Sequence, residues 1–277
     1  MAGVSISYLN AVPVAISGVS KTTSIYRTLD KLGESDLTRR VVVAGGNYIY
    51  TVGFLREISE LDGYVDFVKR TAEISEPIVG IYCLDDGLMP NYYVDGGGKT
   101  KQNRKELSPL DLRIIATLTD DARRPVSEIA AKVGASQKTV RRHLEDMISD
   151  GSLEMNMPVD MQIGGELFLI MHVHLKEGAD KREVGKRLLS RSHLTDQYMR
   201  THVNLPNLLA WVFWSGDIKE IRRVLRETSE DKDVHSVMLN FAYLERLYPT
   251  WRDKLPEVQT HRVDKVRTRK TRAARAK

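Results

Sequence analysis

The sequence contains a single cysteine, Cys83, among its 277 residues. One cysteine excludes an internal disulfide and a zinc site built from several cysteines, and it is typical of proteins in a reducing compartment. The chain also lacks the run of about 20 apolar residues that a membrane span requires. The segment Val4–Ser17 has no basic region before it and is interrupted by polar residues, so it is unlike a signal peptide. These absences predict a cytoplasmic protein with no membrane partner.

Most of the chain also lacks an excess of positive charge. The net charge is +5, but residues 262–277 contain eight Lys or Arg and only one Asp, so residues 1–261 carry a net charge of −2. This end of the chain is almost free of apolar residues. It predicts a basic, disordered tail over 251–277 that either contacts phosphate groups or only improves solubility.

What the chain does contain is an internal repeat at an offset of 158 to 160 residues. Apolar residues alternate over Ile6–Ile16 and Leu167–Leu175, as they do in strands, and a helical pattern follows each stretch. The helix positions that correspond are Ile25 with Val184 and Leu29 with Leu188. Each copy is therefore expected to begin with a strand and a helix.

The remainder of each copy predicts a hairpin, a second helix and a last strand. The hairpin turns are expected at Gly45–Asn47 and around Asn204–Asn207. The order βαββαβ is that of a ferredoxin-like module, an antiparallel sheet with two helices on one face. We expect such modules in residues 1–84 and 163–250. Residues 85–106 between them contain three consecutive glycines and four cations, which predicts a linker.

Residues 107–158, between the linker and the second copy, predict a compact helical unit. The segment Ser108–Asp111 is typical of a helix start, because it combines a capping serine, a proline at the first position and an acid near the positive end of the helix dipole. A second helix is expected over Val126–Val133, with Gly134 ending it. The unit is expected to close with a wing strand near residues 153–157.

A third helix in this unit is predicted to enter the DNA major groove. Ser136 caps it, and four residues at helical spacing are expected to face inward: Val140, Leu144, Met147 and Ile148. The side chains expected to contact base edges or phosphates are Arg123, Arg124, Ser136, Gln137, Lys138, Thr139, Arg141 and Arg142. Three such helices can also serve only for protein contacts, and the slightly negative charge of the unit favours that alternative.

Residues 107 to about 250 resemble the Lrp/AsnC, or feast/famine, family of transcription regulators. The residues that carry the resemblance are Leu110-Asp111, Ile114-Ile115, Leu118, Asp121-Ala122-Arg123, Glu128-Ile129-Ala130, Gly134, Ser136 and Val140. The resemblance implies a winged helix-turn-helix followed by a βαββαβ module called RAM, through which members pair. Residues 1–84 are an additional RAM-like copy. The expected fold is therefore an α+β chain with a winged helix-turn-helix between two ferredoxin-like, RAM/ACT-like modules.

The family resemblance also implies a small effector, such as an amino acid, that binds where modules meet. In the family the hairpin turn commonly reads Gly-x-Tyr-Asp. The first copy has Gly46, Asn47 and Tyr48, followed by Ile49 in place of the acid, whereas the second copy, Asn204 to Asn207, has no glycine. The candidate effector-binding residues are thus Gly46, Asn47, Tyr48, Asn204 and Asn207, although these positions are equally suited to plain turns.

The sequence as a whole predicts a regulator of transcription that is not an enzyme and needs no metal and no cofactor. Its expected partners are double-stranded DNA, further copies of itself in a homodimer or higher oligomer, and the effector. Association with the nucleoid in the cytoplasm would follow. A chromatin-like assembly protein that binds DNA mainly through its tail is one alternative.

A second alternative is an enzyme similar to the siroheme decarboxylases, which share this architecture. Tyr198-x-Arg200-x-His202, with Asn207 and Trp211, resembles a motif of those enzymes, although the spacing differs. His172 and His174 lie two residues apart on a predicted strand and therefore on one face, where they could join His202 as partners of a metal or a tetrapyrrole. Such histidines are more often ordinary polar neighbours in a protein core.

Overall fold

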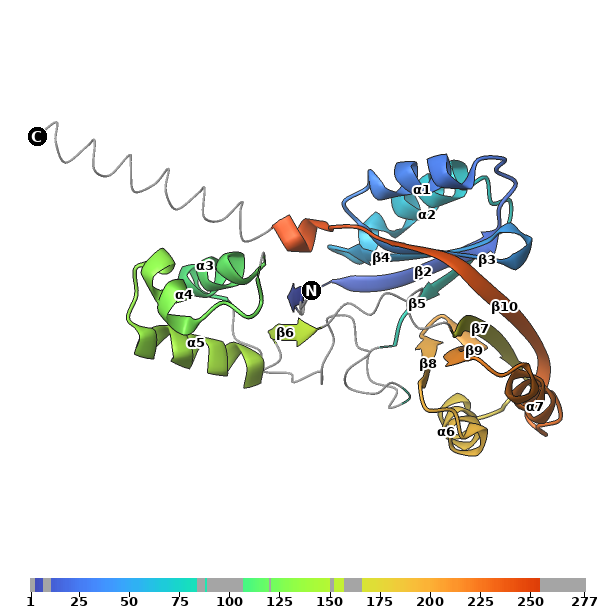
Figure 1. The fold of residues 1–277 in the computed structure, drawn as a ribbon. Coiled ribbons are helices and arrows are strands. Elements are labelled where there is room, and N and C mark those ends of the chain that lie inside the picture. The colour runs from blue at the N-terminus through green and yellow to red at the C-terminus, as the bar shows by residue number, and fades with distance from the viewer. Residues whose placement is uncertain are drawn as a thin grey trace, which may run out of the picture. The chain divides into compact units, whose positions relative to one another are not determined.

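The computed structural model describes residues 3–6, 11–83, 88, 107–119, 121–149, 152–156 and 166–254. These residues belong to two compact units (Figure 1). The smaller unit contains β1 (Gly3–Ile6), α3 (Pro109–Leu118), α4 (Val126–Val133), α5 (Gln137–Ser149) and β6 (Leu153–Asn156). The larger unit contains an eight-stranded antiparallel sheet with helices packed on it.

The larger unit consists of two modules with the same order of elements, βαββαβ. The first module contains β2 (Val12–Val19), α1 (Ile25–Gly33), β3 (Thr38–Ala44), β4 (Tyr48–Leu55), α2 (Leu61–Thr71) and β5 (Ile78–Ile81). The second module contains β7 (Leu167–Leu175), α6 (Lys181–Ser192), β8 (Gln197–His202), β9 (Leu205–Ser215), α7 (Ile218–Ser229) and β10 (Val234–Leu247). The structure therefore confirms the expected α+β class, with an antiparallel sheet in one unit and a helix-turn-helix in the other.

One long strand, β10, joins the two modules into a single sheet of order β5-β2-β4-β3-β10-β7-β9-β8. Its first part pairs with β7, and its last residues, from Ala242 to Leu247, pair with β3. A β-bulge between Ala242 and Leu244 marks the change of partner. A bulge increases the local twist of a strand, and here it lies where β10 passes from one module to the other.

The two outer strands of this sheet, β5 and β8, also meet. Tyr82 and His202 form an antiparallel bridge, and the Val203 N–H donates to the Ile81 carbonyl at 2.8 Å. The Asn204 side chain extends this pairing, because its amide nitrogen donates to the Val79 carbonyl and its amide oxygen accepts the Ile81 N–H, both at 2.8 Å. The sheet is therefore closed within one chain.

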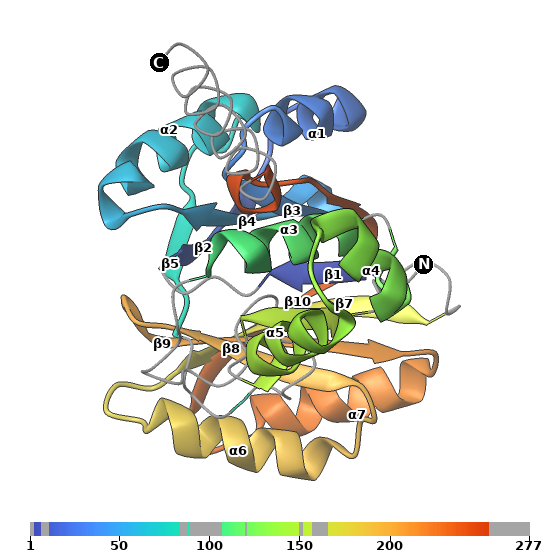
Figure 2. The same cartoon turned by 90° about the vertical axis from the view of Figure 1, so that its left-hand side faces the viewer.

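The helices cover the outer faces of the closed sheet (Figures 1 and 2). Strand alternation separates the side chains: Val14 and Ile16 of β2 pack under α1 and α2, and Leu169 and Met171 of β7 pack under α6 and α7. The intervening residues point to the opposite, inner face. A separate inner cluster contains residues of both modules: Val42, Tyr50, Phe168, Ile170, Tyr198, Val212, Trp214 and Ala242.

Four boundaries differ from those expected from the sequence. The strand expected at Ile6–Ile16 is two strands, because β1 pairs with β6 in the smaller unit and β2 begins at Val12. The second hairpin turn is shorter than predicted, since β9 already begins at Leu205. Leu88, expected in the linker, is buried in the second-module core, and residues 251–254 form a helical turn rather than the start of a tail. The rest of the predicted linker and tail lies outside the described residues.

None of the helices described in this chain is long and apolar enough to cross a membrane.

Candidate nucleic-acid interface

The start of α3, both ends of α4 and the start of α5 lie where the sequence predicts them. Ser108 and Asp111 form a reciprocal cap, in which the Asp111 N–H donates to Ser108 Oγ and the Ser108 N–H donates to Asp111 Oδ2 at 2.7 Å. Gly134 ends α4 with φ of +67°, a conformation that favours glycine. The Thr139 N–H donates to Ser136 Oγ at 3.1 Å, which caps α5.

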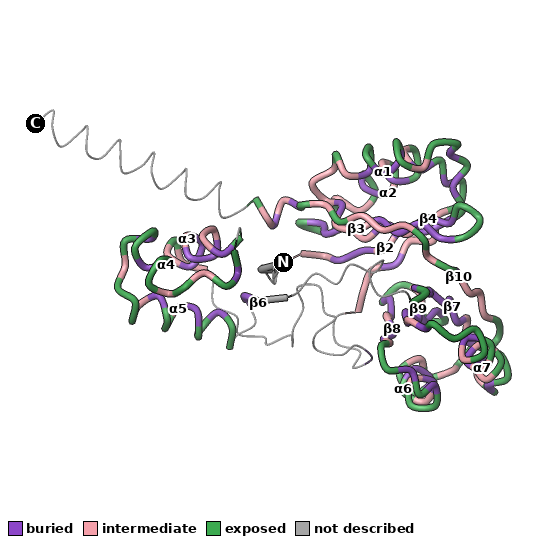
Figure 3. Tube along the Cα trace, viewed as in Figure 1, coloured by how far each residue is buried: buried purple, intermediate pink, exposed green. Residues whose placement is uncertain are grey.

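The inner face of α5 fixes the helix on a small apolar core. Val140, Leu144 and Met147 are buried there with residues of α3 and α4, and Figure 3 shows burial alternating along α5. The prediction that Ile148 also faces inward is wrong, because 49% of its surface is exposed. Ile148 directly follows the buried Met147, and neighbouring residues of a helix are about 100° apart, which turns it toward solvent.

The outer face of α5 carries the residues predicted to bind DNA. Gln137, Lys138, Arg141 and Arg142 are exposed, and none of the three cations has an ion-pair partner among the described residues. The hydroxyls of Ser136 and Thr139 bond to each other at 2.9 Å and serve the helix start. Arg123 is exposed and Arg124 is half-buried in the turn between α3 and α4. The sequence thus identified a helix face on which several long donors stand free.

Sequence reasoning missed one contact that positions α5. Nδ1 of His143 lies 2.6 Å from Oδ1 of Asp111, a residue 32 positions earlier on α3. Burial raises the pKa of the Asp111 carboxyl, but hydrogen bonds from Ser108 and His143 outweigh it and leave the pKa lowered. A histidine beside the inward positions of α5 was the only sign of this contact in the sequence.

The wing strand has a partner that the sequence pattern did not reveal. β6 pairs antiparallel with β1 from Gly3 opposite Asn156 to Ile6 opposite Leu153. Since the alternation in β1 continues into β2, the sequence alone assigned both to the first module. Only the long-range pairing separates them, and it makes residues 3–6 part of the smaller unit.

The five predicted effector residues do not form one site. Gly46 and Asn47 lie in the turn between β3 and β4, beside β10, while Asn204 lies where β8 meets β5. The turn between β3 and β4 lies next to the middle of the sheet order, whereas β5 and β8 are its two ends, so the four strands of one module separate the two places. Tyr48 is buried on the inner face near Ser17, and Asn207 is exposed within β9 rather than in a turn.

Two histidines of the second module lie buried on the inner face of the closed sheet. His172 is 2% exposed with Tyr48 and Tyr50 at its edges, and His202 is 4% exposed and stacks on Tyr82. Nδ1 of each histidine has no hydrogen-bond partner among the described residues. A side chain larger than hydrogen at Gly80 would collide with the His202 ring, since a Cβ there would lie 2.1 Å from it.

Burial makes these two imidazoles weak bases. It lowers the pKa of His172 to about 4, helped by the charge of His174. It lowers the pKa of His202 to about 4 as well, together with the charges of Lys181, Arg200 and His172. Both rings are therefore neutral at pH 7. The described residues contain no group of three or more His, Cys, Asp or Glu suited to holding a metal ion.

The smaller unit is similar in sequence to known DNA-binding proteins. Residues 107–153 match a family model described as "Winged helix-turn-helix DNA-binding". A stretch of 97 residues is 28% identical to the regulatory protein AsnC of Haemophilus influenzae. This stretch is therefore similar to a regulator of the AsnC type. The aligned stretch is 34% of this chain and spans 65%, somewhat under two thirds, of the AsnC protein.

Solved structures show a fold that extends beyond the part shared with AsnC. The crystal structure of the siroheme decarboxylase NirDL is similar over 96% of this chain and 84% of that chain, with a TM-score of 0.61 and 14% identity. NirDL in complex with an iron-uroporphyrin III analogue is similar over 95% and 84%, with a TM-score of 0.62 and 14% identity. At this identity the likeness shows a shared fold.

Proposed function

We propose that this chain is a sequence-specific DNA-binding transcription regulator. The supporting observation is the outer face of α5, where Lys138, Arg141 and Arg142 are exposed and lack ion-pair partners among the described residues, while the opposite face is buried. Cations that form no salt bridge can bond guanine edges or phosphates without first losing another partner. The winged helix-turn-helix match over residues 107–153 supports the same function.

Selection of bound duplexes from a random pool tests this function. A regulator of this kind should enrich a defined sequence. Arg141→Ala or Arg142→Ala should then cost about 1–3 kcal/mol on that sequence if the residue contacts a guanine, and should mainly reduce the salt dependence if it contacts phosphate. Arg222→Ala is a matched control, because Arg222 is an exposed arginine on α7 of the other unit. A pool without enrichment would contradict sequence-specific binding.

We include in this proposal that two chains bind together on DNA. The two modules of one chain already join through β3 and β10, and each chain has one winged helix-turn-helix, so a second such unit would come from a second chain. Two half-sites about 34–36 Å apart would suit such a complex. Sedimentation of the protein with its selected duplex should give two chains per duplex. A complex with one chain would remove this part of the proposal only.

Both α5 and the basic tail are expected to contribute to the affinity for DNA. We expect a chain without residues 262–277 to bind all duplexes more weakly while it keeps its preference for the selected sequence, because eight cations favour any phosphate backbone. Measuring Kd on selected and scrambled duplexes checks this. Loss of the preference itself would favour the chromatin-like alternative.

A second candidate function is the binding of a tetrapyrrole by the closed sheet. The observation that favours it is the pair His172 and His202, each buried with an unbonded Nδ1, in a chain whose fold is shared with NirDL over 96% of its length. Arg200 lies near them, 4.6 Å above the Tyr82 ring, and is a cation that suits carboxylate groups of a ligand. An enzyme function similar to that of the siroheme decarboxylases would require this tetrapyrrole binding.

Titration with iron-uroporphyrin III tests the second candidate. Binding should shift the absorbance of the porphyrin, and His202→Gln should abolish the shift if this imidazole contacts the ligand. His193→Gln is the matched control, because His193 is exposed at the end of α6. An unchanged spectrum with the original protein would eliminate this candidate.

A further inference from the structure

His143 lies on α5 between the face that carries Arg142 and the buried face that carries Leu144. Its side chain is 21% exposed, and the Asp111 side chain beside it is 12% exposed. The two atoms that meet, His143 Nδ1 and Asp111 Oδ1, are 2.6 Å apart, which is short for a contact between nitrogen and oxygen. The contact therefore joins α5 to α3 in a partly buried place that solvent screens only weakly.

Hydrogen bonds with Ser108 fix the position of the Asp111 carboxylate independently of His143. Its Oδ2 accepts the Ser108 N–H at 2.7 Å, and the backbone N–H of Asp111 donates to Ser108 Oγ at 3.2 Å. One carboxylate thus caps α3 with one oxygen and accepts from α5 with the other. A fixed acceptor on α3 determines where the imidazole of His143 can lie.

The apolar contacts of α5 allow a small rotation of the helix about its axis, and the contact between His143 and Asp111 restricts that rotation. Val140, Leu144 and Met147 hold α5 on the core by contacts that have no preferred direction, so they tolerate a small rotation of the helix about its axis. A hydrogen bond to a fixed carboxylate has a preferred length and angle. It therefore sets the rotation of α5, and with it the direction in which Arg141 and Arg142 point.

We propose that His143 is a positioning residue for sequence recognition, which orients the DNA-facing side of α5 through Asp111. This rests on the proposed function as a sequence-specific DNA-binding protein. Bidentate contacts to base edges require side chains placed within about 0.5 Å, whereas phosphate contacts carry no sequence information and tolerate displacement. Loss of the contact should thus reduce discrimination between sequences more than it reduces binding to any DNA.

The test measures Kd of the full chain on its selected duplex and on a scrambled duplex, with the melting temperature measured beside it. His143→Leu fills a similar space without a donor, and should lower the ratio of the two affinities by about 10-fold or more, the size of losing one base contact, while binding to the scrambled duplex changes by less than about 2-fold. His143→Arg keeps a hydrogen-bond donor for Asp111 and should recover most of the ratio. His235→Leu, the same change at an exposed histidine on β10 of the other unit, is the control.

Asp111→Asn gives an independent test, because it keeps an oxygen at the same place and removes the charge. It should lower the ratio by less than His143→Leu does. An unchanged ratio in His143→Leu, an equal loss on both duplexes, or no recovery with His143→Arg would each overturn the inference. If the original protein itself binds both duplexes equally, the proposed function fails instead, so the two failures are distinguishable.

Discussion

The two modules of the closed sheet have the same order of elements but different polar chemistry. Within the first module the hydrogen bonds between buried side chains are neutral, such as the bond from the Tyr64 hydroxyl to Thr38 Oγ1 at 3.1 Å. In the second module Arg187 and Arg191 both bond to Asp231, whose side chain is 1% exposed. All seven histidines of the chain also lie outside the first module. The two modules therefore share their apolar alternation and their fold, while their charged side chains differ.

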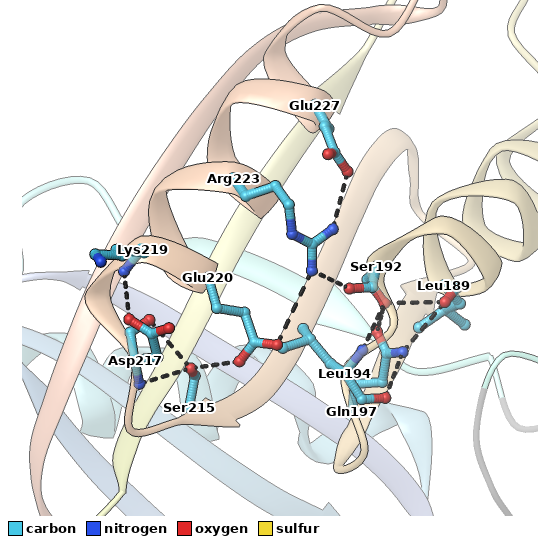
Figure 4. Close-up of polar contacts among 10 residues, drawn as sticks. All are labelled: Leu189, Ser192, Leu194, Gln197, Ser215, Asp217, Lys219, Glu220, Arg223 and Glu227. Atoms are coloured by element: carbon cyan, nitrogen blue, oxygen red, sulfur yellow. Dashed lines mark hydrogen bonds and ion pairs between the residues drawn. The ribbon is translucent and has the colours of Figure 1, made fainter.

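Figure 4 shows how ionic and polar contacts connect α7 to neighbouring segments of the second module. Arg223 donates to the Ser192 carbonyl at the end of α6 at 2.6 Å and to Glu227 at 3.2 Å. Ser215 bonds to Glu220 at 2.6 Å, which ties the end of β9 to the first turn of α7. The second module therefore depends more on the charge state of its side chains than the first module does.

The largest effect expected from this difference is a loss of stability in acid. The pKa values of His172 and His202 are about 4, below the value of about 6.5 for an unfolded histidine, so the unfolded chain binds more protons between these values. The free energy of unfolding should fall by about 3 kcal/mol per histidine as the pH falls from 6.5 to 4, and by less than the sum for both, because His172 contributes to the low pKa of His202.

Urea unfolding between pH 7 and pH 4, followed by tryptophan fluorescence, measures this loss. His172→Phe keeps an aromatic ring against Tyr48 and Tyr50 and should flatten the pH dependence. His193→Gln, at an exposed site, should leave it unchanged. Identical pH dependence in the original protein and His172→Phe would show that the inner histidines do not distinguish the modules.

The next effect concerns the ionic contacts of the second module. Asp231→Ala should lower the free energy of unfolding at pH 7 by about 2 kcal/mol, because it removes charged hydrogen bonds to Arg187 and Arg191. Glu183→Ala, which breaks an exposed pair with Lys186, should cost about 0.5 kcal/mol or less.

The effect of Asp231 should also depend on pH. The hydrogen bond from Arg187 is the largest cause of the lowered pKa of Asp231. Its contribution is thus fully present above the pKa of an unfolded aspartate, about 3.9, and is lost as the pH falls through the lower pKa of the folded state. Chemical unfolding at pH 7 and pH 3 compares the two variants. Equal losses from both at pH 7 would contradict a special role for the buried carboxylate.

The first module should respond to the loss of a neutral hydrogen bond without any dependence on pH. Tyr64→Phe should cost about 1.5 kcal/mol, because it leaves Thr38 Oγ1 buried without this donor. Burial raises the pKa of the Tyr64 phenol, which stays neutral, so the cost should be the same at pH 6 and pH 9. Thermal unfolding at these two pH values provides the measurement. A cost that changes with pH would show that charge matters in the first module too.

The smallest effect concerns the place where the modules meet through β5 and β8. Asn204→Ala should cost about 1 kcal/mol, since the Asn204 amide bonds to the backbone of Val79 and Ile81. Asn207→Ala is the matched control three residues along, on an exposed stretch of β9, and should change the stability by about 0.5 kcal/mol or less. Equal values from urea unfolding would mean that the hydrogen bonds of the Asn204 amide add nothing to stability.

Local patterns in the sequence were sufficient to predict the three helices and the wing strand of the smaller unit, but not β1. The caps Ser108 and Ser136 and the stop at Gly134 act within a few residues, so the predicted bounds of α4 agree with the structure at Val126–Val133. The inward face of α5 was predicted except for Ile148, which lies at the edge of that face. Its exposed donors followed from the same helical spacing.

Most helices and strands, and the helix face that carries the cations, could be predicted from the sequence, because caps, turns and apolar periodicity are local. Only the tertiary structure decided which distant segments pair: β1 with β6, β10 with both β7 and β3, and His143 with Asp111. Nearly every residue type offers the same backbone donor and acceptor, so the sequence of β1 does not show which strand it pairs with. The orientation of the DNA-facing helix depends on one such distant contact.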